Sequence, residues 1–397
     1  MMKVLVFTNL YPNALEPDFG IFIRNRTIAL RQQDKVDIKV VAPVPWFPPV
    51  NISARWYRFS QIPLRETIDG IEVFHPRYLV TPKVGMSLYG YSMFLGVRRL
   101  IGRMRENFAF DLIDAHFLYP DGFAACLLGR HLNCPVVLTA RGSDVTSYLQ
   151  MPRIRTLVAR SLQQADRLIA VSNSLRDQMV AHGAMPEKIA VIPNGIDPSL
   201  FFRKDAARAR RQLGLREDAK IILTVCSLVE LKGVDLLIEA VARLRADSSW
   251  PVRLVVIGKG PEEDRLRMLI KRLALEDCVR LVGSVANREL VDWYNAADLF
   301  FLGSSREGWP NVVCEALACG TPVVATAVNG IPEILDSEEL GIMVERTPEA
   351  FVRGIEQAFA RSWDRGKIAE RGQGRTWQKV AGEVHKLFAT VLSHAHD

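Results

Sequence analysis

The sequence predicts two doubly wound α/β domains, each built around a parallel sheet. Short apolar runs alternate with amphipathic helical segments along the chain, and glycine-bearing loops follow several of these runs. The pattern starts at residues 3–8, KVLVFT, stops near residue 193, and starts again at Lys220. The 397 residues are 49% hydrophobic, which is enough for two separate cores. The expected divisions are a first domain at 1–193, a linker at 194–216 and a second domain at 217–375.

The first half opens with a strand–helix–strand unit. The strand at 3–8 is followed by the loop NLYPNALEPDFG, a helix over 21–33 and a strand over 36–42. Gly20 lies where this helix begins, and a glycine there would let the backbone approach a ligand; a plain turn glycine is the alternative. Further expected elements are strands at 71–75, 111–116, 136–139, 167–171 and 188–192, a basic amphipathic helix at 86–107 and a helix at 120–132.

Residues 43–63, PVPWFPPVNISARWYRFSQIP, are rich in proline and aromatic residues. This composition predicts an irregular segment on the rim of the first domain. Loops held by a rigid scaffold often carry binding groups, so this segment is a candidate for contacting an acceptor.

The second half repeats the strand–helix alternation after a join that begins with PNGIDPSLF, which carries Asn-Gly and Asp-Pro turn signals. A last amphipathic helix is expected at 376–392. The expected strands lie at 220–226, 253–257, 279–282, 299–302 and 323–325, and the expected helices at 234–245, 265–274, 287–296, 311–319 and 350–359.

The net charge of +7 is unevenly distributed. Residues 1–193 hold 23 Lys and Arg against 15 Asp and Glu, so the first half carries all the excess. Four arginines, at 98, 99, 103 and 105, fall on one expected helix, and three, at 55, 58 and 65, lie near Trp56 and Tyr57. Basic residues mixed with aromatic residues can dock on an anionic membrane or an anionic acceptor, with a solvated basic face as the alternative. No nucleic-acid-binding signature accompanies the charge, so we expect no nucleic acid partner.

The chain is expected to be cytoplasmic. No apolar run approaches the roughly 20 residues that span a bilayer, and the N-terminus leads directly into a strand. The six cysteines form no C-x-x-C pair and lie in apolar stretches, as buried free thiols do.

Residues 304–325, SSREGWPNVVCEALACGTPVVA, combine a loop, a short helix and a strand. Pro310 suits the first turn of a helix, and Gly320 suits its end. At such a helix start the N–H groups of Asn311, Val312 and Val313 are expected to be free, and the helix dipole favours an anion there. The sequence therefore predicts a phosphate or diphosphate site.

Two glutamates flank this helix start. Glu307 lies in the loop before the helix, and Glu315, eight positions later, lies inside it. This separation suits two ends of an elongated ligand, with each carboxylate accepting hydrogen bonds from hydroxyl groups. From the spacing alone, two surface glutamates on an ordinary helix remain an equally good interpretation.

The whole string, from R-E-G-W-P-N through E-A-L-A-C-G-T-P-V-V-A-T to G-I-P-E-I, resembles retaining glycosyltransferase family 4 and its E-x7-E motif. The resemblance implies the GT-B fold: two Rossmann-like domains facing a cleft, with a C-terminal helix, 376–397, that crosses back to the first domain. F-G-I-F-I-R-N-R and H-F-L-Y-P-D-G are similar to a bacterial subgroup that acts in exopolysaccharide or teichuronic-acid-type synthesis.

The resemblance implies roles for residues of the second domain. Glu307 would face the donor sugar, Glu315 would hold the ribose hydroxyls, and Lys232, in VCSLVELKG, would face the diphosphate. Ser227 stands where the family has arginine, so one positive charge is missing from the pattern. Gly258, Gly283 and Gly308 complete the donor-binding set together with the three amides at 311–313.

In the first domain, His116 matches the family's histidine near the donor sugar, and Gly20 matches a glycine beside the donor phosphate. R-G-S-D at 141–144 resembles H-G-x-D, with Arg141 in place of histidine. Asp144 is an acceptor-side base or a structural partner of Arg141; the sequence leaves both open.

The resemblance implies a nucleotide-sugar donor, by default a UDP-sugar, and a glycan or lipid-linked glycan acceptor in bacterial surface polysaccharide synthesis. No cofactor and no metal are expected, because no ligand set with metal spacing is present. Peripheral contact with the inner face of the plasma membrane would agree with the basic first half. The alternatives are a GT-B sugar-nucleotide epimerase and a non-catalytic nucleotide-sugar-binding protein.

Overall fold

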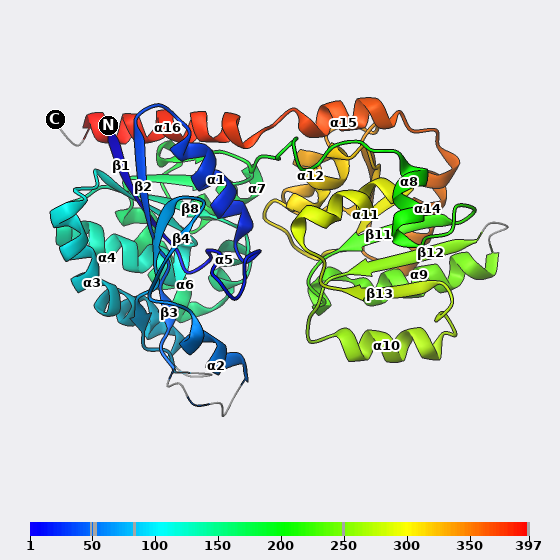
Figure 1. Cartoon of the computed structure of the whole chain (residues 1–397), viewed down its shortest axis with the longest axis horizontal. Helices are drawn as coiled ribbons and strands as arrows, with labels where there is room; N and C mark the ends of the chain where they lie inside the picture. Colours follow the sequence, from blue (N-terminus) through cyan, green and yellow to red (C-terminus); the bar gives the residue numbers. More distant parts are fainter. Residues whose placement is uncertain (48–49, 51–53, 82–84, 248–250, 395–397) are drawn as a thin grey trace. The chain divides into compact units, whose positions relative to one another are not determined.

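The computed structural model describes residues 1–47, 50, 54–81, 85–247 and 251–394. The chain divides into two compact units: unit 1 comprises Met1–Gly195 with Trp377–Asp397, and unit 2 comprises Ile196–Thr376 (Figure 1). None of the described helices is long and apolar enough to cross a bilayer. All six cysteines are free thiols.

Unit 1 is built on an eight-stranded sheet in the order β10-β9-β8-β7-β1-β2-β5-β4, in which only the edge strand β4 runs antiparallel. A separate two-stranded parallel sheet pairs β3 with β6. The strands are β1 (Met2–Phe7), β2 (Val36–Val41), β3 (Val44–Pro45), β4 (Arg65–Ile68), β5 (Ile71–Phe74), β6 (Arg77–Tyr78), β7 (Leu112–His116), β8 (Val136–Ala140), β9 (Arg167–Ala170) and β10 (Ile189–Val191).

The helices of unit 1 include the C-terminal helix α16, which packs beside α1 on the sheet (Figure 1). Val380, Val384 and Phe388 of α16 are buried in the same core as Val4 and Ile38, so the expected return of the last helix to the first domain is confirmed. The helices are α1 (Ile21–Arg31), α2 (Ala54–Gln61), α3 (Tyr89–Asn107), α4 (Phe123–Leu132), α5 (Ser143–Thr146), α6 (Pro152–Gln164), α7 (Asn173–Ala181) and α16 (Trp377–His394).

Unit 2 is built on a six-stranded, fully parallel sheet in the order β13-β12-β11-β14-β15-β16. One core lies under α11, α12, α13 and α15, and a second lies under α9, α10 and α14, so helices cover both faces. The elements are β11 (Lys220–Val225), β12 (Val252–Ile257), β13 (Val279–Gly283), β14 (Leu299–Leu302), β15 (Val323–Thr326), β16 (Gly341–Val344), α8 (Ala206–Leu213), α9 (Val234–Asp247), α10 (Glu263–Arg272), α11 (Leu290–Ala296), α12 (Asn311–Ala318), α13 (Ile331–Ile334), α14 (Pro348–Ala360) and α15 (Arg365–Gln373).

Two expectations about irregular segments were wrong. Residues 43–63 include the strand β3 and the helix α2, and β3 is stabilised by pairing with β6, a partner far along the chain. The expected linker at 194–216 contains α8, whose Asp205 side chain caps its first turn by accepting from the Arg208 N–H. Arg210 of α8 binds Asp298 and so fixes this helix on unit 2. Residues 48, 49 and 51–53 of the first segment, and the Arg55 side chain, lie outside the described part.

Candidate active site

In unit 2, loops that follow neighbouring strands are packed closely at the carboxyl edge of the sheet. Gly258 follows β12 with φ of 138°, and a Cβ there would lie 1.8 Å from the Cys226 carbonyl oxygen. Its N–H donates to the carbonyl of Gly283 at the end of β13. Gly258 therefore has a structural reason to be glycine, and so has Gly283, whose φ of 86° lies in the left-handed region. Their predicted contact with a donor remains a prediction. Ligands of open parallel sheets bind at this edge.

Lys232 and Glu307 form an ion pair in this cluster of loops. Lys232 ends a short 3-10 turn, and Gly233 continues it in the left-handed region with φ of 65°. The loop after β14 is tied to this turn, because the Ser305 N–H donates to the Leu231 carbonyl at 2.8 Å. The side chains of Lys232 and Glu307 keep 20% and 11% of their exposure, so a ligand can reach both.

Two further residues fix Glu307, and neither was predicted. The Ser304 hydroxyl donates to Glu307 Oε1 at 2.6 Å, so this oxygen is shared with Lys232 Nζ. The Glu307 N–H donates to Asn329 Oδ1 at 3.1 Å. Asn329 follows β15, so the side chain and the backbone of Glu307 are held by different strand-end loops.

The start of α12 differs from its prediction at the amide of Val313. Pro310 precedes the helix in an extended conformation, and the Val313 N–H donates to the Pro310 carbonyl at 3.0 Å. The expectation of a free Val313 N–H was therefore wrong, because the first turn of the helix closes on itself. Asn311 and Val312 keep their positions at the helix start beside the buried Gly308.

Glu315 of α12 is buried, with 8% of the residue exposed. Its Oε2 accepts a hydrogen bond of 2.8 Å from the Tyr294 hydroxyl. Burial raises the pKa of Glu315 to about 7, and the Tyr294 hydrogen bond only partly opposes this shift. Tyr294 belongs to α11, and its spacing in the sequence gave no signal that it would meet Glu315.

Ser227, the residue at the family's arginine position, lies in the exposed part of the loop after β11. Its backbone carbonyl accepts from the Val229 N–H at 2.9 Å, which tightens the turn that leads to Lys232. Lys232 is therefore the cation that this loop presents beside Glu307.

In unit 1, a buried charged cluster lies at the end of β7. Arg26 of α1 binds both carboxylate oxygens of Asp114 at 2.5 Å and the Thr139 hydroxyl at 3.0 Å. Arg141 donates to His116 Nδ1 at 2.6 Å and to Asn194 at 2.8 Å. Arg26 and Asp114, which were not predicted as site residues, hold this cluster together.

His116 is fully buried, and its two ring nitrogens face Arg141 and Asp114. Nδ1 accepts from Arg141, so the neutral ring carries its hydrogen on Nε2, which lies 3.3 Å from Asp114 Oδ2 without hydrogen-bond geometry. Burial, reinforced by Arg26 and Arg141, lowers the pKa of His116 to about 3, although Asp114 opposes this. This geometry favours a structural role for His116, as a neutral residue that positions Arg141. It argues against a role in which His116 exchanges a proton with the substrate.

The Asp144 carboxylate is bound by the backbone. It accepts from the N–H groups of Leu118, Arg141 and Gly142 at 2.7 to 3.2 Å and is fully buried. Burial raises its pKa against the opposing effect of these hydrogen bonds. Asp144 was predicted to be either an acceptor-side base or a structural partner of Arg141, and this arrangement favours the structural role. Asp144 binds the backbone N–H of Arg141 and not its guanidinium group.

Gly20 precedes α1 in the left-handed region with φ of 65°. A Cβ there would lie 2.2 Å from the Leu10 carbonyl oxygen, so the loop after β1 requires glycine at this position. Its predicted contact with a donor phosphate is not needed to explain the residue and remains a prediction. Within the described ranges, no group of three or more His, Cys, Asp or Glu side chains is placed to hold a metal ion.

Comparison with known proteins identifies both halves of the chain. The model of "Glycosyl transferases group 1" matches residues 205–375, and that of "Glycosyltransferase Family 4" matches residues 40–200. TuaC of Bacillus subtilis (strain 168), whose name assigns it to teichuronic acid biosynthesis, is 30% identical over 360 residues, covering 89% of this chain and 88% of that protein. A D-inositol 3-phosphate glycosyltransferase of Kineococcus radiotolerans is 36% identical over 380 residues, covering 86% of each chain.

Solved structures share the fold at low identity. Sucrose-phosphate synthase from Thermosynechococcus elongatus has a TM-score of 0.78 at 19% identity, covering 99% of this chain and 100% of that chain. Anabaena HepE in complex with UDP and glucose has a TM-score of 0.74 at 20% identity, covering 98% and 100%. The two family models and the relatives of 30% and 36% identity show that the chain is a glycosyltransferase that belongs to family 4, and the solved structures show that it has the GT-B fold.

Proposed function

We propose that this glycosyltransferase moves a sugar from a nucleotide-diphospho-sugar to a hydroxyl of a glycan or lipid-linked glycan, with retention at the anomeric carbon. The observation that carries the proposal is the Lys232–Glu307 ion pair at the carboxyl edge of the unit 2 sheet. A partly buried ammonium group that pairs with a carboxylate is suited to bind a diphosphate in exchange. Glu307 is then released to accept hydrogen bonds from the donor sugar.

Each residue of unit 2 receives one role in this proposal. Lys232 and the N–H groups of Asn311 and Val312 stabilise the leaving diphosphate, and Ser227 adds at most a hydrogen bond. Glu315 accepts hydrogen bonds from ribose hydroxyls. Gly258, Gly283 and Gly308 keep side chains away from the donor. In unit 1, His116, Arg141 and Asp144 shape the loops at 116–118 and 140–145, beside the loop that starts α1 at Gly20.

The reaction proceeds by front-face displacement in this proposal. The acceptor oxygen bonds to the anomeric carbon while the bond from that carbon to the diphosphate oxygen breaks on the same face. The departing diphosphate oxygen takes the acceptor proton, so no protein base is needed. Catalysis then comes from positioning and from charge stabilisation. No metal enters these steps, and activity that EDTA abolishes would contradict this part of the proposal.

The donor is proposed to carry uridine, and the product to belong to a bacterial surface polysaccharide. The UDP complexes of HepE and the name of the Bacillus relative support these choices. Inositol-phosphate glycosyltransferases among the relatives support a different acceptor, so the acceptor needs its own test.

We further propose that α3 rests on the inner face of the plasma membrane. Leu88, just before α3, and Tyr91 and Leu95 in its first half are 61%, 40% and 55% exposed. Arg98, Arg99 and Arg103 follow at helical spacing and are exposed, and none of them forms an ion pair within the described part of the chain. Apolar and cationic side chains on one face suit an anionic bilayer.

Co-sedimentation with vesicles tests this contact. Vesicles that contain phosphatidylglycerol should retain the protein, and the double variant Arg98→Gln and Arg99→Gln should bind them less. Arg353→Gln, at a charged position on α14 of unit 2, is the control. Equal retention by pure phosphatidylcholine vesicles would contradict an electrostatic contact.

A thermal-shift panel of UDP-, GDP- and ADP-sugars tests the donor proposal, because a ligand that binds the native state raises the melting temperature. We expect a clear rise with a UDP-sugar, and a smaller rise with Lys232→Met at the same ligand concentration. No rise with any member of the panel would contradict the proposal. A rise without transfer or hydrolysis of the donor would instead support a non-catalytic binder.

A further inference from the structure

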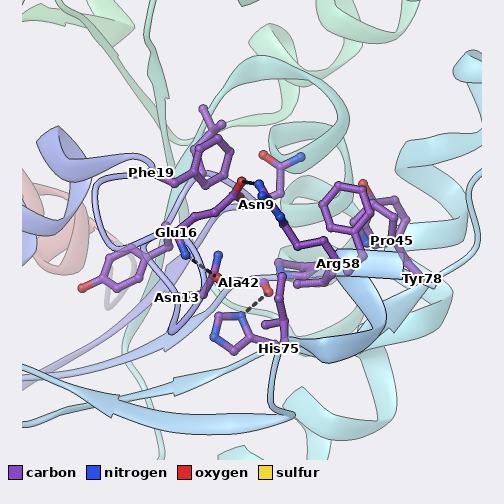
Figure 2. Close-up of a pocket in the computed structure, with 15 residues that line it drawn as sticks. Asn9, Asn13, Glu16, Phe19, Ala42, Pro45, Arg58, His75 and Tyr78 are labelled. Carbon is purple, nitrogen blue, oxygen red and sulfur yellow. Dashed lines mark hydrogen bonds and ion pairs between the residues drawn. The ribbon is translucent and has the colours of Figure 1, made fainter. Parts of the chain in front are cut away.

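A pocket of about 520 Å³ lies in unit 1, apart from the charged cluster of Arg26, Asp114 and His116. The loop after β1 forms one side, Ala42–Pro45 at the end of β2 forms another, and α2 with Tyr78 of β6 encloses the rest (Figure 2). It therefore lies where β1, β2 and β5 end, at the ligand-binding edge of this sheet.

The walls of the pocket are largely rings and aliphatic side chains. Phe19, 41% exposed, and Phe59 of α2 contribute aromatic rings, and Pro43 and Pro45 contribute flat apolar surfaces. His75 closes the base, with its ring nitrogens 3.1 Å from the Ala42 carbonyl oxygen and 2.7 Å from the Glu66 carboxylate. These surfaces can pack on the C–H faces of a ring but give no ionic selectivity.

Two lining residues of this pocket, Tyr11 and Asn13, have a polar side-chain group without a partner among the described residues; for Tyr11 it is the buried hydroxyl. Asn13 is 7% exposed, and its Oδ1 is fixed by the backbone N–H groups of Leu15 at 3.0 Å and Glu16 at 3.1 Å. No hydrogen-bond partner for Nδ2 exists among the described residues, and Figure 2 shows the Asn13 amide facing the pocket. Asn13 thus presents a fixed N–H donor that a ligand oxygen would satisfy.

The charges of the pocket are balanced. Arg58 is its one arginine, and it donates to Glu16 Oε1 at 2.9 Å across the pocket (Figure 2). A phosphate site needs uncompensated cations or several aligned N–H groups, whereas an uncharged hydroxyl group can bond to the Arg58–Glu16 pair without separating it.

We propose that this pocket binds an uncharged sugar ring of the acceptor, with Asn13 donating to a ring hydroxyl and Phe19 packing on the C–H face. This inference rests on the proposed transfer to a glycan and narrows it, because it excludes an acceptor whose bound ring is phosphorylated. The ring is either the end of a growing glycan or the first sugar on a lipid carrier.

The test uses the full chain saturated with UDP. Binding of each member of a panel of methyl glycosides is measured by ligand-observed NMR. At least one glycoside should bind. Asn13→Asp keeps the oxygen that caps the turn but replaces the free N–H₂ with a second oxygen, so affinity should fall roughly tenfold. Phe19→Ala should reduce affinity by a similar factor. Met185→Ala changes an exposed residue of unit 1 outside the pocket and should bind as the parent does.

Three results would overturn the inference: no member of the panel binds, Asn13→Asp and Phe19→Ala bind the glycosides as the parent does, or inorganic phosphate displaces the bound glycoside. The rise in melting temperature with a UDP-sugar measures binding at the donor site independently of the pocket. A retained rise with any of these results would leave the proposed function in place and remove only the pocket assignment. If a glycoside binds equally well with and without a lipid aglycone, the sugar ring alone is sufficient for binding to the pocket.

Discussion

In unit 1, Arg26, Asp114 and His116 form a strand-end cluster that is almost completely buried, with the Arg26 and Asp114 side chains 3% and 1% exposed. In unit 2, Lys232 and Glu307 also meet at strand ends, but their side chains keep 20% and 11% of their exposure. Both clusters pair a cation with a carboxylate near the carboxyl ends of strands. They differ in whether a ligand could replace one member of the pair.

The difference in exposure distinguishes an ion pair that stabilises the structure from one that can take part in the reaction. Removing one partner of a buried ion pair leaves a charge without compensation, so such pairs are not exchanged during a reaction. A partly exposed ion pair can open when an anionic ligand takes the place of its carboxylate beside the cation. We therefore assign the stability of the loops in unit 1 to Arg26 and Asp114, and the donor chemistry to Lys232 and Glu307.

The largest expected effect concerns stability. Asp114→Asn should lower the free energy of unfolding by about 3–5 kcal/mol, because Arg26 remains buried without its counter-charge. Asp69→Asn is the matched control: it removes the pair with Arg24, two positions earlier on α1, where the side chains are 29% and 32% exposed. The control should cost no more than about 1 kcal/mol. Equal losses in urea unfolding would contradict the comparison.

The next effect concerns turnover. Glu307→Gln should keep UDP affinity and reduce transfer or donor hydrolysis by roughly 10²–10³-fold, because the donor sugar loses a charged acceptor in the transition state. His116→Gln is the counterpart in unit 1, since it keeps a side chain that can accept from Arg141. Turnover within about tenfold of the parent is expected for that variant. If Glu307→Gln turns over normally, or His116→Gln is inactive with an unchanged melting temperature, the assignment of chemistry to unit 2 is wrong.

A smaller effect follows from pH. Burial raises the pKa of Glu315 from 4.5 to about 7, so this carboxyl group contributes its full stabilisation below pH 4.5 and loses it as the pH rises through 7. Glu315→Gln removes this dependence, so the variant should become more stable relative to the parent as pH rises, by on the order of 3 kcal/mol at most. His116 responds oppositely, because its lowered pKa means that stability falls as the pH drops below 6.5.

The same titration bears on donor binding. If the Glu315 carboxylate accepts from ribose hydroxyls, UDP affinity should rise between about pH 6 and pH 8 as the carboxyl group ionises. Glu315→Gln should show a flat profile. Calorimetric titration at each pH measures these affinities, and a pH-independent affinity of the parent would remove Glu315 from the donor site.

The regular elements were largely predictable from the sequence. The strand at 299–302 has the predicted bounds, and the helix expected at 311–319 is one residue shorter. Apolar runs and helical periodicity are local signals, and they identified these elements. The helices α6 and α7 were missed, and the segment at 43–63 was misjudged, because β3 depends on a distant partner, β6, and its proline content argued against regular structure.

The candidate site was less predictable. Lys232 and Glu307 were identified through a family motif, and the structure brings them into contact. Tyr294, Ser304 and Asn329 were missed because hydrogen bonds to Glu315 and Glu307 depend on how loops from different strands meet. The burial of His116 and the closed Val313 amide likewise follow from tertiary packing, which a motif does not encode.

Calorimetric titration of UDP into the parent and Lys232→Met tests the central claim most directly. If the ammonium group leaves Glu307 to bind the diphosphate, affinity for UDP should fall roughly 10–100-fold in the variant, while uridine, which has no phosphate, should bind both proteins alike. Equal UDP affinity in the two proteins would contradict the exchange of Lys232 between Glu307 and the donor.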